Sequence, residues 1–192
     1  MLCEFNCALH QHFEKYHVIQ TQHFPVGFGS PESPIKIYIA NRPPIDSYPI
    51  MQELRSMLPG EIDHIVKHTS NHWRKVFNVY AKFLFDWQTQ TSNNMLTRWQ
   101  DYREQALFQD SSVASLLFSP PQFDDPSAHF HIVAGKTYAA LLSLPSLVWI
   151  DQYFAFNQKH HLIVSPYPDY RQLSNDRTMT LITLMKSVAN PT

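Results

Sequence analysis

The chain contains little glycine and little cysteine. Only 4 of its 192 residues are glycine, and no motif of the GxxxxGK[ST] or GxGxxG type occurs. A glycine-rich phosphate-binding loop is therefore not expected. Cys3 and Cys7 are the only cysteines. Two thiols alone do not make a zinc site, so we expect two free thiols.

Long apolar runs and an excess of basic residues are also missing. No stretch approaches the roughly 18 consecutive apolar residues that span a membrane, and the N-terminus does not have the pattern of a signal peptide. The formal net charge is −1 and the isoelectric point is about 6.8. No overall basic field is available to hold duplex DNA, although a local basic groove is compatible with this balance. We expect a cytoplasmic protein that does not enter a membrane.

Apolar residues are plentiful enough for a core. They make up 44% of the chain, and aromatic residues make up 14%. A length of 192 residues suits one domain, so we predict a single α/β domain over residues 1–192. Within it, residues 1–34 are expected to form an N-terminal extension. That extension holds a short strand over 16–22 and a turn-rich linker, FPVGFGSPESP, over 24–34.

Alternating β-branched and aromatic residues predict strands over 35–40, 129–135 and 160–165. The segment 147–156 fits either a helix or a strand. Three- and four-residue spacing and capping residues predict helices over 47–58, 61–69, 71–90, 93–109, 111–118, 136–144 and 174–188. The alternation of strands and helices in the last third predicts a three-layer α/β/α fold. Its central sheet is expected to be mostly parallel, with about four strands.

Ligands of parallel α/β sheets bind at the carboxyl ends of the strands. Three such ends are predicted, after Ala40, Val133 and Val164. The candidate residues that follow them are Asn41, Arg42, Pro43 and Asp46, then Lys136, then Tyr167, Pro168, Asp169, Tyr170 and Arg171. Aromatic faces beside guanidinium groups suit nucleobases and phosphates. The plainer alternative is that these prolines and tyrosines only stiffen a turn.

Three stretches resemble motifs of the uracil-DNA glycosylase-like superfamily. IKIYIANRPP resembles the first strand of that family, which ends in a proline-containing motif with an Asp or Asn. HFHIVAGKTYAALL resembles its strand that ends in a glycine before a helix, and HHLIVSPYPDYRQLS its strand that ends in an SPHPSP-type loop. The resemblance covers the C-terminal third and one early strand, and leaves roughly residues 60–125 unmatched. It implies a glycosylase-like fold with the site at the strand ends.

The chain departs from the family pattern at its reactive positions. Tyr167 stands where the family usually places a histidine, and a neutral phenol can only donate one hydrogen bond to the base. Arg171 falls near the residue that fills the gap left by a flipped base. Asn41, Arg42 and Asp46 are the nearest counterparts of the water-activating residue. We therefore expect binding of a nucleobase, nucleotide or single-stranded nucleic acid, without a cofactor and without efficient uracil excision. Any catalysis would be N-glycosidic hydrolysis.

Two other readings stay open. His64, His68 and His72 follow one another at four-residue steps, which suits a metal-dependent hydrolase if one helix carries them. Thr69-Ser70-Asn71 predicts a helix break there, however, and the pair His129 and His131 needs Asp63 or Asp124 to complete a metal site. Ordinary exposed or half-buried histidines, and no metal, are expected. The remaining reading is a non-catalytic structural protein that forms homo-oligomers, with the aromatic helix 71–90 as core or as a subunit contact.

Overall fold

The fold is α/β, with one eight-stranded mixed sheet and five α-helices among the residues that the structure describes. The structure is a computed structural model, and it describes residues 24–91 and 96–189. The strands are β1 (Gly27–Phe28), β2 (Ile35–Tyr38), β3 (Leu54–Arg55), β4 (Ala114–Leu117), β5 (Phe130–Ala134), β6 (Val148–Trp149), β7 (Ala155–Asn157) and β8 (Leu162–Ser165). The helices are α1 (Glu61–His68), α2 (Asn71–Thr91), α3 (Trp99–Gln105), α4 (Lys136–Leu141) and α5 (Asn175–Ala189), with a 3₁₀ turn, η1, at Tyr48–Ile50.

Four parallel strands form the centre of the sheet. The strand order is β3-β1-β4-β2-β5-β8-β7-β6, and β4, β2, β5 and β8 all run in the same direction. β1 pairs antiparallel with β4, and β7 pairs antiparallel with both β8 and β6. The sheet is therefore larger than the expected sheet of about four strands, and it is mixed because antiparallel strands flank the parallel centre. The additional strands are two or three residues long, which is too short for an alternating pattern to be recognised.

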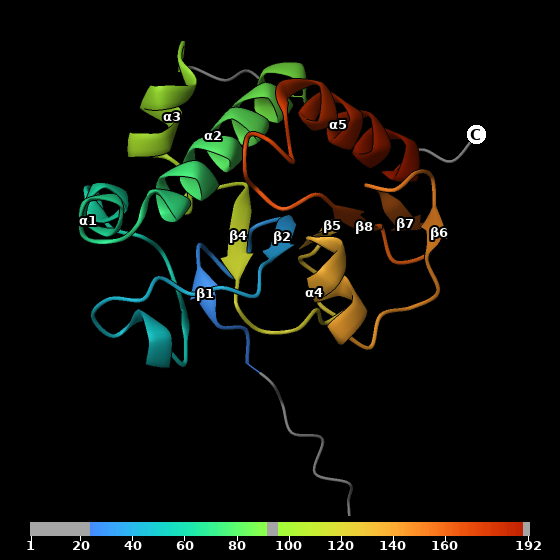
Figure 1. Ribbon diagram of the computed structural model, residues 1–192, viewed down its shortest axis with the longest axis horizontal. Helices are drawn as coiled ribbons and strands as arrows, with labels where there is room; N and C mark the ends of the chain where they lie inside the picture. The colour runs from blue at the N-terminus through green and yellow to red at the C-terminus, as the bar shows by residue number, and fades with distance from the viewer. Residues whose placement is uncertain (1–23, 92–95, 190–192) are drawn as a thin grey trace, which may run out of the picture.

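Helices cover both faces of the sheet. Alternate residues of β2 point to opposite sides. Ile35 and Ile37 belong to the core cluster that includes residues of α1, α2, α3 and α5, whereas Tyr38 belongs to a second cluster with Ala139 of α4. Figure 1 shows α2 and α5 side by side across the top of the molecule and α4 separate from them. Both faces of the central strands are buried, which explains their near-continuous apolar sequences.

The long aromatic helix is confirmed as part of the core. Trp73, Phe77, Tyr80 and Phe83 of α2 are almost completely buried. The predicted break is also confirmed, because α1 ends at His68 and α2 begins at Asn71. Among the described helices, none combines the length and the apolar character needed to cross a membrane.

Two of the predicted helices are wrong, because each of these segments contains a strand of the sheet. Residues 111–118 contain β4, which lies between β1 and β2 and is buried on both faces. A short apolar run of this kind has no periodicity that separates strand from helix. Residues 47–58 form η1 and β3 instead of one helix. There Leu54 pairs with Gly27, and Arg42 Nη1 donates to the carbonyls of Pro49 and Met51, so tertiary contacts override the local preference.

Smaller differences concern segment ends. Within 93–109 the structure describes only α3, because a turn at Ala106–Gln109 replaces the last helical residues. The ambiguous segment 147–156 supplies β6 and part of β7, joined by a turn in which Asp151 Oδ1 accepts the N–H groups of Tyr153 and Phe154. The expected linker 24–34 contributes β1 to the sheet. The predicted strand over 16–22 and both cysteines lie outside the described residues.

Candidate functional site

A pocket of about 300 Å³ lies at the carboxyl ends of β5 and β8. It brings together three of the predicted residues, Lys136, Tyr167 and Arg171. The full lining is Gly135, Lys136, Gln152, Tyr153, Pro166, Tyr167, Arg171, Gln172 and Arg177. We call this set the strand-end pocket. Three cations and two tyrosines belong to it, and none of the described residues that line it is a carboxylate.

Gly135 and Tyr167 form the contact between the two strand ends. Gly135 has a φ of +96°, a conformation that side chains other than glycine rarely adopt, and it starts α4 directly after β5. A Cβ atom at this position would lie 3.6 Å from Cδ2 of Tyr167. The ring of Tyr167 therefore rests against the backbone of the neighbouring strand end.

The phenol of Tyr167 reaches α2. Its oxygen lies 2.8 Å from Nε2 of His72, and the two rings are 5.5 Å apart. Burial raises the pKa of Tyr167, and the nearby Asp169 carboxylate adds to this rise. Burial lowers the pKa of His72, as does the Lys75 ammonium, while Asp169 opposes them. Both groups are therefore held neutral near pH 7, and Tyr167 presents no charge to the pocket.

Arg177 at the start of α5 organises the other side of the strand-end pocket. Its guanidinium lies 3.7 Å from the ring centre of Tyr153, and Nη1 donates to the carbonyl of Gln172 at 2.6 Å. A longer contact of 3.4 Å reaches the carbonyl of Arg171. Arg177 thus fixes the backbone of the loop after β8, while the side chain of Arg171 is exposed.

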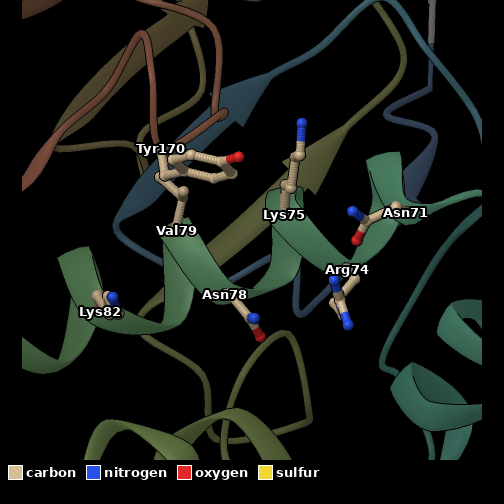
Figure 2. A pocket seen from close by; sticks show the side chains of 7 residues that line it. All are labelled: Asn71, Arg74, Lys75, Asn78, Val79, Lys82 and Tyr170. Carbon is tan, nitrogen blue, oxygen red and sulfur yellow. The ribbon is translucent and has the colours of Figure 1, made fainter.

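Tyr170 separates the strand-end pocket from a second hollow on α2. This hollow has a volume of about 330 Å³ and is lined by Asn71, Arg74, Lys75, Asn78, Val79, Lys82 and Tyr170. We call it the α2 groove. In Figure 2 the ring of Tyr170 lies above Val79 and next to Lys75, whereas Arg74 and Asn78 leave the helix on its other side. The loop after β8 thus borders both hollows.

The ring of Tyr170 is open to solvent and flanked by cations. Its side chain is 56% exposed. Lys75 Nζ lies 5.1 Å and Arg171 Cζ lies 5.7 Å from the ring centre. Asp169 holds Lys75 in place through an ion pair of 2.7 Å, and hydrogen bonds from Lys75 and from the Arg171 backbone N–H lower the pKa of Asp169. An exposed ring between two cations is a surface suited to a nucleobase with its phosphate.

The residues after β2 are engaged elsewhere. Arg42 donates to the carbonyls of Pro49 in η1 and of Met51 just after it, and it lies over the ring of Phe118. Pro43 is buried. Asp46 Oδ2 lies 2.7 Å from His64 Nε2 of α1, and Asn41 is exposed. None of these four residues lines the strand-end pocket or the α2 groove. Of the predicted site, Pro168 is buried and Asp169 supports Lys75.

The histidines do not assemble a metal site within residues 24–91 and 96–189. No group of three or more His, Cys, Asp or Glu side chains there is arranged to hold a metal ion. His64 and His68 are neighbours on α1, but His72 belongs to α2 and contacts Tyr167. His131 is buried, with Nδ1 2.7 Å from the phenol oxygen of Tyr38. These contacts leave the metal-dependent hydrolase without geometric support.

A family model spans both the strand-end pocket and the α2 groove. It is described as "Family of unknown function (DUF6942)" and matches residues 26–186. The chain belongs to this family. No curated protein and no solved structure matches it. For this DUF6942 member, the match begins just before β1 and ends within α5, so it includes the N-terminal edge of the sheet as well as the α/β repeat.

Sequence reasoning missed the residues that the helices contribute to the candidate site. His72, Arg74, Lys75 and Lys82 come from α2, and Arg177 comes from α5. The only signal in the sequence is the polar stripe at positions 71, 74, 75, 78 and 82 of a helix whose other side is apolar. Nothing in that stripe indicates that the loop after β8 lies against it.

Proposed function

We propose that this protein binds a nucleotide in the strand-end pocket, with the base near the tyrosines and the phosphate near the cations. The observation that supports this proposal is the joint presence of Lys136, Arg171 and Arg177 with Tyr153 and Tyr167 in one pocket without a carboxylate. The formal net charge of the whole chain is −1, so this concentration of cations is local. Such a combination favours an anionic, aromatic ligand.

Each part of the ligand has a matching group. Arginine guanidinium groups donate paired hydrogen bonds to phosphate oxygens, and Arg171 is an exposed arginine that lines the pocket. The side-chain amides of Gln152 and Gln172 can donate to and accept from the edge of a base. The ring of Tyr167 rests on Gly135 and offers a flat surface that does not depend on base identity.

We further propose that the pocket does not excise uracil efficiently. Hydrolysis of an N-glycosidic bond needs a group that positions water and a group that stabilises charge on the departing base. Asp46, the nearest predicted acid, is paired with His64 and does not line the pocket. Tyr167 shares its hydroxyl with His72, and its raised pKa keeps it neutral. The resemblance to uracil-DNA glycosylases thus favours a shared site position without their chemistry.

Calorimetric titration with thymidine and deoxyuridine monophosphates tests this function. We expect both to bind the wild-type protein and the Arg171→Gln variant to bind them about tenfold more weakly. Lys159→Gln is the matched control, because Lys159 is exposed and precedes β8, at the opposite end of that strand. Equal binding by the two variants, or no binding by the wild type, contradicts the proposal. A uracil-excision assay on single-stranded DNA is expected to show no release above the protein-free control.

Self-association is a second candidate, supported by the edge of the sheet. β6 is the last strand on its side, and Val148, Trp149 and Ile150 are 60%, 40% and 52% exposed. Pairing of β6 with β6 of a second copy would cover these side chains and the open edge. Sedimentation analysis of the wild type and of Val148→Lys tests it: a dimer that the substitution converts to a monomer supports the pairing, and a monomeric wild type excludes it.

A further inference from the structure

The α2 groove carries more positive charge than its neighbours neutralise. Three of its lining residues are cations, Arg74, Lys75 and Lys82, and none is acidic. Asp169 pairs with Lys75, and the carboxylate of Asp86, one turn further along α2, interacts with Lys82. Glu104 pairs with Arg103, which also binds Asn78. Arg74 is exposed on the helix surface, and Lys82 Nζ lies 5.0 Å from the ring centre of Trp99. The groove therefore keeps a positive potential that an anion can use.

The cations are ordered along the helix. Arg74, Asn78 and Lys82 follow at four-residue steps, so they form one ridge on α2. Arg74 and Lys82 are eight residues apart, which corresponds to about 12 Å along the helix axis. A compact anion such as free phosphate cannot contact both ends of this ridge. A chain of phosphates can.

The α2 groove and the strand-end pocket share one wall. Tyr170 lines the first and Arg171 lines the second, so consecutive residues of a single loop face the two hollows. Arg177 contacts the backbone of Arg171, and the guanidinium of Arg171 lies beside the ring of Tyr170. On the other side of this ring come Lys75 and then the ridge on α2, as Figure 2 shows. One aromatic face thus lies between two groups of cations, a combination that proteins use to bind single-stranded nucleic acids.

We propose that the α2 groove binds a stretch of single-stranded nucleic acid that continues from the nucleotide in the strand-end pocket. One base stacks on Tyr170, and the phosphates that follow lie along Arg74 and Lys82. This inference rests on the proposed function and makes it more specific, because it names a polynucleotide as the ligand instead of a free nucleotide. An acidic polypeptide shares the charge of such a strand but lacks the bases, so Tyr170 discriminates between the two.

Fluorescence anisotropy with a labelled oligothymidylate of about 12 nucleotides tests the proposal, beside calorimetry with thymidine monophosphate. The wild type is expected to bind the oligonucleotide at least about tenfold more tightly than the mononucleotide. The double variant Arg74→Gln/Lys82→Gln is expected to lose about tenfold in oligonucleotide affinity, and the dependence of log K on log salt is expected to become shallower by about 1.4. Its affinity for the mononucleotide should match that of the wild type. Lys159→Gln should change neither.

Tyr170→Ala and a poly-glutamate peptide complete the test. Loss of the ring is expected to weaken oligonucleotide binding about tenfold or more, and the peptide is expected not to compete. Equal affinity for mononucleotide and oligonucleotide, or an unaffected double variant, overturns the groove proposal and leaves the pocket proposal standing. Oligonucleotide binding that depends on the ridge, without any mononucleotide binding, supports the groove and contradicts the pocket. If the peptide competes and Tyr170→Ala leaves the oligonucleotide affinity unchanged, the nucleic-acid assignment of the groove is overturned.

Discussion

The phenol oxygen of Tyr167 and Nε2 of His72 lie 2.8 Å apart and connect the loop after β8 to the first turn of α2. Lys75 and Asp169 form a second connection between the same two segments, an ion pair of 2.7 Å. Together these contacts hold the loop between the strand-end pocket and the α2 groove. A site whose walls are fixed before the ligand arrives loses less entropy on binding.

Tyr167→Phe tests whether the first of these contacts stabilises the fold. The substitution keeps the ring and removes the hydroxyl, so His72 loses its partner in a half-buried position. We expect the free energy of unfolding to fall by about 1 kcal/mol, measured by urea denaturation. Tyr153→Phe, at the opposite side of the pocket, is the comparison. A Tyr167→Phe variant as stable as the wild type would contradict a structural role for this hydrogen bond.

The buried side chain of His131 is expected to make the folded protein less stable in acid. Burial lowers its pKa from 6.5 to about 4 in the folded protein, with Lys36 acting in the same direction and Asp125 opposing. The unfolded chain therefore binds more protons between these two pH values, and stability falls as the pH falls through this window. The difference corresponds to about 3 kcal/mol for a shift of this size.

Urea unfolding of His131→Gln and the wild type between pH 7 and pH 4 measures this contribution. The loss of stability on acidification is expected to be smaller in the variant than in the wild type. His129→Gln, which replaces an exposed histidine two residues away, should retain the wild-type slope. Parallel pH profiles for His131→Gln and the wild type would show that His131 is not the group responsible.

Glu61 joins η1, β3 and the start of α1. Its carboxylate accepts hydrogen bonds from the hydroxyl of Tyr48, the backbone N–H of Leu58 and the guanidinium of Arg55. Burial alone would raise the pKa of Glu61, but hydrogen bonds from Arg55, Leu58 and Tyr48 outweigh it and lower the pKa. We expect Glu61→Ala to reduce the free energy of unfolding by about 2 kcal/mol, because it leaves the buried hydroxyl of Tyr48 without its acceptor and Arg55 without its ion pair.

Thermal and urea denaturation of Glu61→Ala beside Asp63→Ala checks this expectation. Asp63 lies in the same helical turn but is exposed, so its removal should cost less than about 0.5 kcal/mol. A similar loss for both variants would mean that the charge near the helix start matters and the buried network does not.

Arg177→Lys separates geometry from charge at the strand-end pocket. Lysine keeps the positive charge but loses the flat guanidinium that lies on Tyr153 and binds the carbonyl of Gln172. We expect nucleotide affinity to fall about three- to tenfold with little change in unfolding temperature. Calorimetric titration measures the affinity, and Arg98→Lys, at the exposed residue just before α3, is the control. Unchanged affinity would show that Arg177 acts only through its charge.

The sequence predicts the centre of this fold well because its central strands and long helix carry strong patterns. Ile35, Ile37 and Ile132 alternate with residues of the opposite face, and the apolar positions of α2 repeat along the whole helix. β4 was predicted as a helix because ASLL is buried on both faces and has no period. β1, β3 and β6 have two residues each, so only their hydrogen-bonded partners define them as strands.

The site was predicted in part for the same physical reason. Lys136, Tyr167 and Arg171 share a pocket because β5 and β8 are parallel neighbours, which places their carboxyl ends together. Asp46 follows β2, but its loop turns toward α1 instead of the pocket. The contribution of α2 depends on how a helix packs against a loop nearly a hundred residues away, and no local pattern encodes that contact.

Photochemical cross-linking of a single-stranded oligonucleotide that carries 5-bromouracil tests the central claim most directly. The modified base bonds to an aromatic side chain that it contacts, and peptide mapping by mass spectrometry locates the bond. We predict cross-links at Tyr153, Tyr167 or Tyr170, lost in the presence of excess unmodified oligonucleotide. Two results would contradict nucleotide binding at the carboxyl ends of β5 and β8. One is cross-links confined to Trp99 or other aromatic residues away from the strand ends. The other is a yield of cross-links no higher than that of an unrelated control protein.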